Sequence, residues 1–176
     1  MPVSALVATA GSATANTYCT LAVANQYHLD RPAAGTVWSA ATDDQKNSGL
    51  LFATVLLDRL FYWNGYVVNE IQNLLWPRMG LYEVNRISAL DYTTIPQLIQ
   101  WATAEFSRQL IAEDRTGDSD VQTQGIKLIK VGSVRIDFKD AVFAKPIPDI
   151  VTNLIPEEWG YVLQNEKINI RELRRA

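Results

Sequence analysis

The strongest constraint on the fold is the stretch from Thr42 to Phe61, which begins like a helix and then becomes almost continuously apolar. The Thr42 side chain can accept a hydrogen bond from the free amides of a first helical turn, and Gln45 can reach back to the Thr42 amide, which together make a capping box. Asp43 and Asp44 then place negative charge at the positive end of the helix dipole. The sequence therefore predicts a helix that begins at this point.

The second half of this helix is apolar over most of its circumference, since Thr54 is the single polar residue between Leu50 and Leu57. One stripe is formed by Leu50, Ala53, Leu57, Leu60 and Phe61, and it is widened by Phe52, Val55 and Leu56. A helix of this kind has neighbours on several sides, so we expect the central helix of a small bundle. Asp58 and Arg59, near its end, are interpreted as solvated charges.

A second long helix is predicted after Pro96, whose missing amide is harmless in a first turn, and it should continue to about Ala112. Its apolar face consists of Ile99, Ala102, Phe106 and Leu110. Glu105 and Arg108 are three residues apart and can pair on the outer side.

A shorter helix, Leu21–Leu29, follows the capping residue Thr20. His28 is interpreted as a packing residue, because no carboxylate and nucleophile accompany it. Trp38 should dock the next connection onto the bundle. Residues 1–16, rich in Ala, Ser, Thr and Gly, are expected to form a loose or extended arm.

Composition limits the chemistry of this 176-residue chain, which is 48% hydrophobic and 20% charged and suits one domain with an appendage. Cys19 and His28 are single residues of their types, so one chain lacks the ligands of a structural zinc site and the cysteines of a disulfide framework. The acidic stretch 113–125 lacks the spacing of an EF-hand calcium loop and is interpreted as solvated. We expect no cofactor, no membrane partner and a reducing, intracellular origin.

The sequence Trp76-Pro77-Arg78 has two interpretations. It could be a binding surface, or Trp76 could be buried while Arg78 makes a local ion pair or contacts backbone carbonyls. The second interpretation is favoured.

Residues 126–138 change from a helical to a two-residue period and predict a β-hairpin with Gly132-Ser133 as its turn. Pairing Val131 with Val134 and Ile129 with Ile136 gives an apolar face of Ile129, Val131, Val134, Ile136 and Phe138. The same register sets Lys130 opposite Arg135, a like-charge pair that costs free energy, unless the turn is longer or that face meets an acidic surface. Because an isolated hairpin is marginal in water, the apolar face is expected to contact a neighbouring subunit.

The C-terminal stretch 157–176 follows a short predicted helix, Asp149 to Leu154, and carries apolar and basic residues. Four basic and two acidic residues give Glu166 to Ala176 a net charge of +2, on a body that is otherwise acidic. Such a tail suggests docking elsewhere, and the candidate docking residues are Trp159, Tyr161, Ile168, Ile170, Arg171, Leu173, Arg174 and Arg175. The alternative is a tail that folds back on its own bundle as a last helix.

The order of these features resembles one family. It includes Ala15-Asn16-Thr17-Tyr18, Leu50 to Asp58, Leu75-Trp76-Pro77-Arg78, Ile95-Pro96 and Lys130-Val131-Gly132-Ser133. This order is similar to that of phage proteins labelled "DnaT-like single-stranded DNA-binding protein", whose architecture is similar to the head-tail connector, or head-completion, adaptors of tailed bacteriophages. The resemblance covers residues 12–155.

The expected fold is therefore mainly α, a small helical bundle with an inserted β-hairpin and an extended tail. Its parts are an arm at 1–16, an adaptor domain at 17–155 and a docking tail at 156–176. Trp76, Pro77 and Arg78 are the family motif and are interpreted as structural.

The resemblance implies a non-enzymatic adaptor in the virion neck, made in the host cytoplasm. Such adaptors form a ring, commonly a dodecamer, between the portal protein and the next neck or tail-completion protein, and double-stranded DNA passes through the channel without specific binding. The C-terminal segment of such adaptors often reaches the portal. The alternative is a DnaT-like single-stranded DNA-binding replication protein. The net charge of −3 and the lack of a Lys/Arg stripe interleaved with aromatics argue against a single-strand groove. An enzyme is a distant third, since no phosphate loop, G-x-S-x-G or H-E-x-x-H motif occurs.

Overall fold

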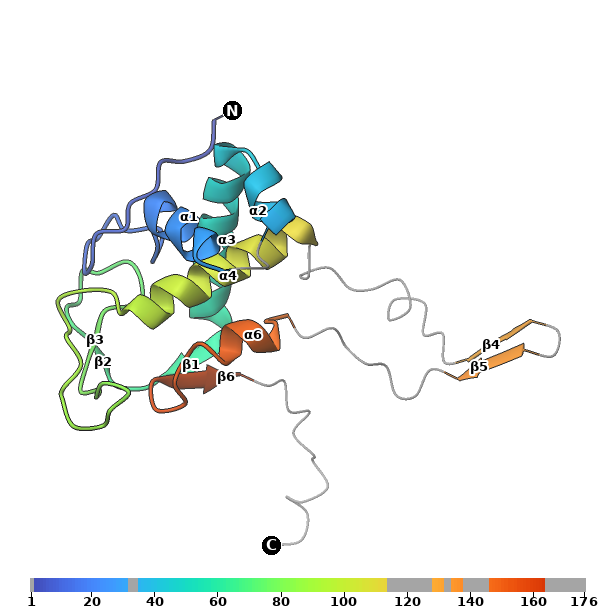
Figure 1. Ribbon diagram of the computed structural model, residues 1–176. Coiled ribbons are helices and arrows are strands. Elements are labelled where there is room, and N and C mark those ends of the chain that lie inside the picture. The colour runs from blue at the N-terminus through green and yellow to red at the C-terminus, as the bar shows by residue number, and fades with distance from the viewer. Residues whose placement is uncertain (1, 32–34, 114–127, 132–133, 138–145, 164–176) are drawn as a thin grey trace, which may run out of the picture.

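The computed structural model describes residues 2–31, 35–113, 128–131, 134–137 and 146–163. Within them, helices provide most of the regular structure and the strands form two-stranded ribbons (Figure 1). The helices are α1 (Leu21–Leu29), α2 (Gly35–Ala40), α3 (Asp43–Leu60), α4 (Gln97–Ala112) and α6 (Asp149–Thr152). The strands are β1 (Phe61–Trp63), β2 (Tyr66–Val67), β3 (Arg78–Met79), β4 (Leu128–Val131), β5 (Val134–Asp137) and β6 (Gly160–Val162).

Helices α3 and α4 pack across each other at the centre of the body (Figure 1). The predicted capping box starts α3: Gln45 N donates to Thr42 Oγ1 over 3.2 Å, and Thr42 N donates to Gln45 Oε1 over 2.9 Å. Gly49 lets the helices approach closely, since a Cβ there would lie 2.4 Å from Ser107 Oγ. The core between them is formed by Ala53, Leu57, Ile99, Ala102 and Phe106. Both long helices are confirmed.

One side of α3 is open, which corrects the expectation of an apolar stripe covered over most of the circumference. Phe52 and Val55 remain 42% and 51% exposed. The helix is covered where α1 and α4 lie against it, and the third side faces solvent.

Helices α1 and α2 build a second core around an aromatic stack. The Thr20 side chain caps α1 by accepting from Val23 N, as predicted. His28 packs against the Trp38 ring with centroids 4.4 Å apart and its Nε2 lies 3.1 Å from Ala104 O. Trp38 docks as expected, and its Nε1 donates to Asn25 Oδ1 over 2.9 Å. His28 is therefore a packing residue, and burial lowers its pKa.

The N-terminal segment is extended and held against the body. Val7 N donates to Asn16 Oδ1 over 2.7 Å within the segment, and Asn73 Nδ2 of the body donates to Ala15 O over 2.8 Å. Beyond this loop the backbone enters the core, where Tyr18 and Cys19 are at most 1% exposed. Burial raises the pKa of the Cys19 thiol to about 12.

Strand β6 pairs antiparallel with β1, which corrects the expectation that the whole stretch 157–176 is a tail that docks elsewhere. Val162 pairs with Phe61 and Gly160 with Trp63. Trp159 is 2% exposed, and its Nε1 donates to Tyr82 O over 2.8 Å. Residues 157–163 thus belong to the body, because they pack against an aromatic cluster. No local sequence pattern reveals that cluster.

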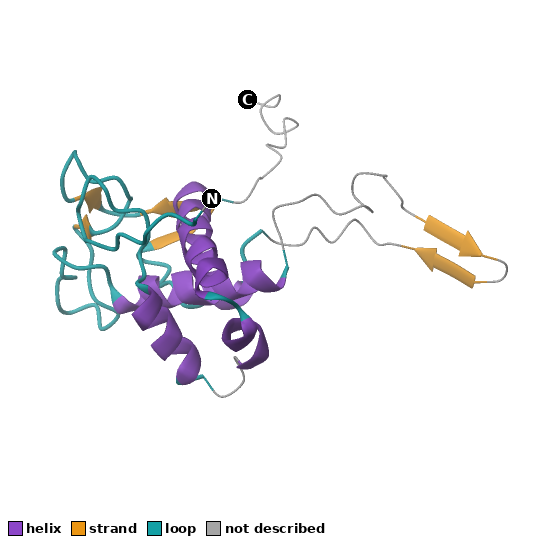
Figure 2. Ribbon diagram, turned by 90° about the horizontal axis from the view of Figure 1, so that it is seen from above, coloured by secondary structure: helices purple, strands orange, loops and turns teal. Residues whose placement is uncertain are grey.

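Strands β4 and β5 form the predicted hairpin with the predicted register. Ile129 pairs with Ile136 and Val131 with Val134, so Lys130 lies opposite Arg135. The hairpin stands apart from the helical body in both views (Figures 1 and 2). The expected turn at 132–133 and Phe138 lie outside the described residues.

Across the part of the chain that the structure describes, no helix combines the length and apolarity that crossing a membrane requires.

Candidate functional site

The Trp76-Pro77-Arg78 motif forms a structural anchor, as favoured by the sequence. Trp76 is 1% exposed, and the Trp76–Pro77 peptide bond is cis. Arg78 turns inward beneath the β1–β2 connection and donates to four backbone carbonyls: Asn64 O at 2.5 Å, Gly65 O at 2.7 Å, Leu75 O at 3.0 Å and Trp63 O at 3.3 Å. A planar guanidinium can serve several acceptors in this way. The motif therefore fixes a loop and is not an open binding surface.

Around this anchor lies the tryptophan cluster, formed by Phe61, Trp63, Trp76 and Trp159. Phe61 stacks on Trp63 with centroids 4.7 Å apart. Trp76 lies 5.5 Å from Trp63 and 5.7 Å from Trp159. Three segments distant in sequence are joined here. Trp159, proposed from the sequence as a docking residue, is thus assigned to the core.

Asp58 is not a solvated charge, contrary to the interpretation from sequence. Its carboxylate accepts a hydrogen bond from the Tyr18 hydroxyl and another from Leu75 N over 3.2 Å. The Tyr18 oxygen in turn accepts from Trp76 N over 3.2 Å. Burial raises the pKa of Asp58 to about 6, although these hydrogen bonds oppose the shift. The tyrosine pKa is also raised, first by burial and then by the Asp58 charge. The pair joins the N-terminal segment, α3 and the Trp76 loop.

Glu105 was expected to pair on the outside of α4, but it is fully buried. It does pair with Arg108, at 2.6 Å, and it also accepts from Arg31 and from Gln109 Nε2. Burial alone would raise its pKa, but the hydrogen bonds from Arg108 and Arg31 outweigh burial and lower it. The carboxylate thus fastens α1 to α4.

The cations of the described body are mostly engaged within the chain. Besides Arg31, Arg78 and Arg108, Lys46 lies 3.7 Å from Asp43 and Arg86 pairs with Glu158. Arg59, at the exposed end of α3, has no such partner among the described contacts. Arg31, Arg78 and Arg108 thus stabilise the fold through contacts within the chain.

Charge is segregated along the sequence. Residues 126–145 hold five basic and two acidic residues, and residues 164–176 hold four and two, so both segments are net positive. The remainder of the chain is correspondingly acidic, since the total is −3. Any attraction for phosphate therefore resides in the hairpin region and the C-terminal segment.

An exposed aromatic pair lies on the outer face of the β1–β6 ribbon. Tyr62 and Tyr161 pair across the ladder, and their rings stack with centroids 5.3 Å apart. They are 52% and 54% exposed. Alternation along β1 explains the position, because Phe61 and Trp63 face the core. Tyr161, a residue proposed for docking, is thus accessible, whereas Ile168, Ile170, Arg171, Leu173, Arg174 and Arg175 lie outside the described residues.

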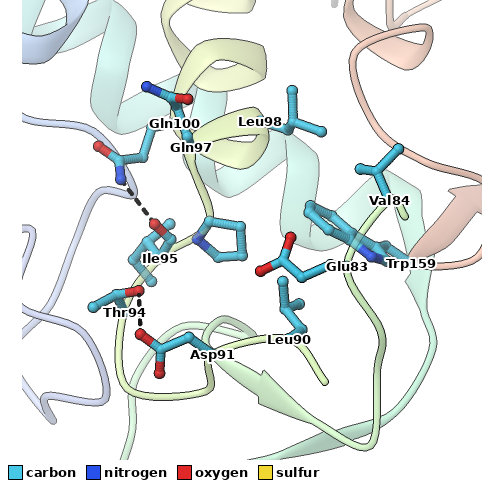
Figure 3. Close-up of a pocket in the computed structure, with 11 residues that line it drawn as sticks. Glu83, Val84, Leu90, Asp91, Thr94, Ile95, Gln97, Leu98, Gln100 and Trp159 are labelled. Carbon is cyan, nitrogen blue, oxygen red and sulfur yellow. Dashed lines mark hydrogen bonds between the residues drawn. The ribbon is translucent and has the colours of Figure 1, made fainter. Parts of the chain in front are cut away.

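A cavity of about 510 Å³ opens where the loop before α4 meets Trp159 (Figure 3). Glu83 and Asp91 contribute carboxylates and Leu90 an apolar wall. The Asp91 carboxylate accepts from the Thr93 amide and hydroxyl and from Thr94 Oγ1, and these bonds lower its pKa. The Asp91 carboxylate is thus used in shaping the loop.

Among the described residues, no three His, Cys, Asp or Glu side chains come close enough to hold a metal ion.

Comparison with known proteins assigns the chain to a family. The sequence profile of a family described as "Putative DnaT-like ssDNA binding protein" matches residues 5–171. Neither the curated proteins nor the solved structures gave a significant match. Because the profile spans nearly the whole chain, the protein belongs to this DnaT-like family.

Proposed function

We propose that the chain is a non-enzymatic assembly protein, the head-to-tail adaptor of a tailed phage neck. In this function copies of the chain form a ring beneath the portal protein and join it to the next neck or tail-completion protein. Double-stranded DNA passes through the ring without specific binding. Virion neck and portal are proposals that rest on the resemblance of the motif order to head-tail adaptors.

The observation that carries an assembly function is the hairpin. Its apolar positions Ile129, Val131, Val134 and Ile136 alternate with polar ones in the sequence and pair with one another across the ladder, a pattern that predicts one apolar face. The hairpin stands away from the body (Figure 2). A two-stranded ribbon with an apolar face is marginally stable alone, and a neighbouring subunit would supply the missing surface.

The distribution of charge supports a channel that lets DNA pass. Non-specific affinity for DNA depends on neutralising phosphates with lysine and arginine. In the described body, Arg31, Arg78, Arg86 and Arg108 already bind carboxylates or carbonyls. An acidic body would repel the DNA backbone weakly and would not hold it.

A second function, single-stranded DNA binding, is favoured directly by the family description. The exposed Tyr62–Tyr161 stack offers a platform of the kind on which bases stack. Arg59 lies three residues before Tyr62, and the basic C-terminal segment follows Tyr161 closely. These features could form a small single-strand site at one end of the body.

Titration of fluorescent oligonucleotides at about 50 and 200 mM salt separates the two functions. The adaptor predicts weak binding, with a dissociation constant well above the micromolar range at the higher salt. The paired variant Tyr62→Ala/Tyr161→Ala should then have no effect. Micromolar or tighter binding that weakens steeply with salt and is lost in this variant would establish the second function and overturn the first.

A further inference from the structure

The open side of α3 borders a groove that is separate from the tyrosine pair and the tryptophan cluster. Its volume is about 590 Å³, and its apolar lining includes Phe52, Leu110 and Ile111. Asp44 and Gln45 lie at the end nearest the α3 N-terminus. A groove with an apolar floor and an acidic end suits a segment that is apolar and basic.

The exposed residues of α3 extend this groove along the helix. Ser48, Phe52, Val55 and Arg59 are all exposed and follow one another at intervals of four, three and four residues. Such spacing keeps side chains on one face of a helix. The face therefore runs from the groove to the end of α3.

The described chain ends beside the last turn of α3. Leu163 N donates to Leu60 O over 2.7 Å, so the backbone leaves β6 beside the last residue of α3. Strand β1 continues from α3, and β6 runs antiparallel to β1. The described chain therefore ends within reach of the exposed α3 face.

The thirteen residues that follow have the length and chemistry to cover the face. The distance from Leu60 to Ser48 along α3 is about 18 Å at 1.5 Å per residue. Thirteen residues span about 20 Å as a helix and about 43 Å when extended. In an antiparallel helix, Ile168 would come level with Val55, and Arg175 would come within a side chain's length of Asp44.

We propose that residues 164–176 dock on the exposed α3 face of their own chain, with apolar side chains over Phe52 and Val55 and arginines toward Asp44. The occupant of the groove is thus the chain's own C-terminal segment, in place of the portal docking expected from the sequence. This inference is independent of the adaptor function, because it concerns the single chain.

Disulfide trapping in the full chain tests the contact. Cysteines are introduced at Ser48→Cys, in the groove, and Ala176→Cys, at the C-terminus. The matched control pairs Ala176→Cys with Ile87→Cys, in the loop between β3 and α4, where Ile87 is 83% exposed. The native Cys19 is fully buried and does not compete.

The expected result is an intramolecular disulfide that forms at least about tenfold faster than in the control, because docking raises the effective concentration of the two thiols. Phe52→Asp, added to the trapping pair, should abolish this advantage while the circular dichroism spectrum stays native. Equal rates for the trapping and control pairs would overturn the proposal. A disulfide found only between two chains would also overturn it and would assign the groove to a second copy.

Discussion

Replacing Arg78 by alanine should be among the most damaging single substitutions in this protein. Arg78 is 8% exposed, and its guanidinium donates to the carbonyls of Trp63, Asn64, Gly65 and Leu75. A hydrogen bond from a charged group contributes roughly 1.5–3 kcal/mol, but the contributions of one group are not additive and the desolvation of the cation offsets part of them. We expect Arg78→Ala to lower the free energy of unfolding by about 3–4 kcal/mol, a large share of the 5–15 kcal/mol typical of a domain.

Urea unfolding at neutral pH, followed by tryptophan fluorescence, measures this loss, since Trp63 and Trp76 lie beside the anchor. Arg78→Lys keeps the charge but not the planar fork, so it should recover only part of the loss. Arg86→Ala is the matched control, because Arg86 pairs with Glu158 at the surface and should cost under about 1 kcal/mol. If Arg78→Ala costs no more than Arg86→Ala, the reasoning about the carbonyl anchor is wrong.

Three further substitutions probe the fold. Burial raises the pKa of Asp58 to about 6, above its value in the unfolded chain. The contribution of Asp58 to stability should therefore be greatest below the unfolded pKa and decrease as pH rises through about 6. Urea titrations across this range should show that the pH-dependent contribution is lost in Asp58→Asn. The pKa of Glu105 is lowered, so its contribution to stability is present at neutral pH and lost in acid. Glu105→Gln should lower the free energy of unfolding by about 3 kcal/mol at pH 7, because it leaves Arg31 with a weakened partner. Gly160→Ala would place a Cβ 2.7 Å from Trp63 Cε3 and should cost about 1–3 kcal/mol through overpacking, measured by thermal unfolding.

Local signals predicted the helices and the hairpin well. The Thr42–Gln45 capping box and the Thr20 cap depend on residues three apart, so they can be recognised in a sequence. Pro96 likewise marks the start of α4, which begins at Gln97. The hairpin register follows from a two-residue spacing between alternating segments, and the observed pairs are the predicted ones.

Partners distant in sequence explain most of the failures. Asp58 is held by Tyr18, 40 residues earlier, and Glu105 by Arg31, 74 residues earlier. A charged residue on a helix has the same local pattern whether it is solvated or buried with a partner. Burial therefore depended on tertiary packing that neither helix encodes alone.

The predicted boundary between the body and the C-terminal tail was wrong for a related reason. Residues 157–176 are too few to form a core of their own, which made a docking tail plausible. Trp159 instead completes a cluster with Trp63 and Trp76, and β6 adds to β1. The prediction for α3 was wrong in the opposite direction. Its apolar pattern predicted that Phe52 and Val55 are buried, but the described body leaves them exposed.

The most direct test of the adaptor function is the location of the protein in tailed phage particles made by a genome that encodes it. Quantitative mass spectrometry of purified particles, with and without this gene, measures whether the chain is a stoichiometric component and whether tails attach. The account predicts several copies in each complete particle, and DNA-filled heads without tails when the gene is deleted. Particles that lack the protein, together with a deletion that stops DNA replication and leaves head-tail joining intact, would contradict it.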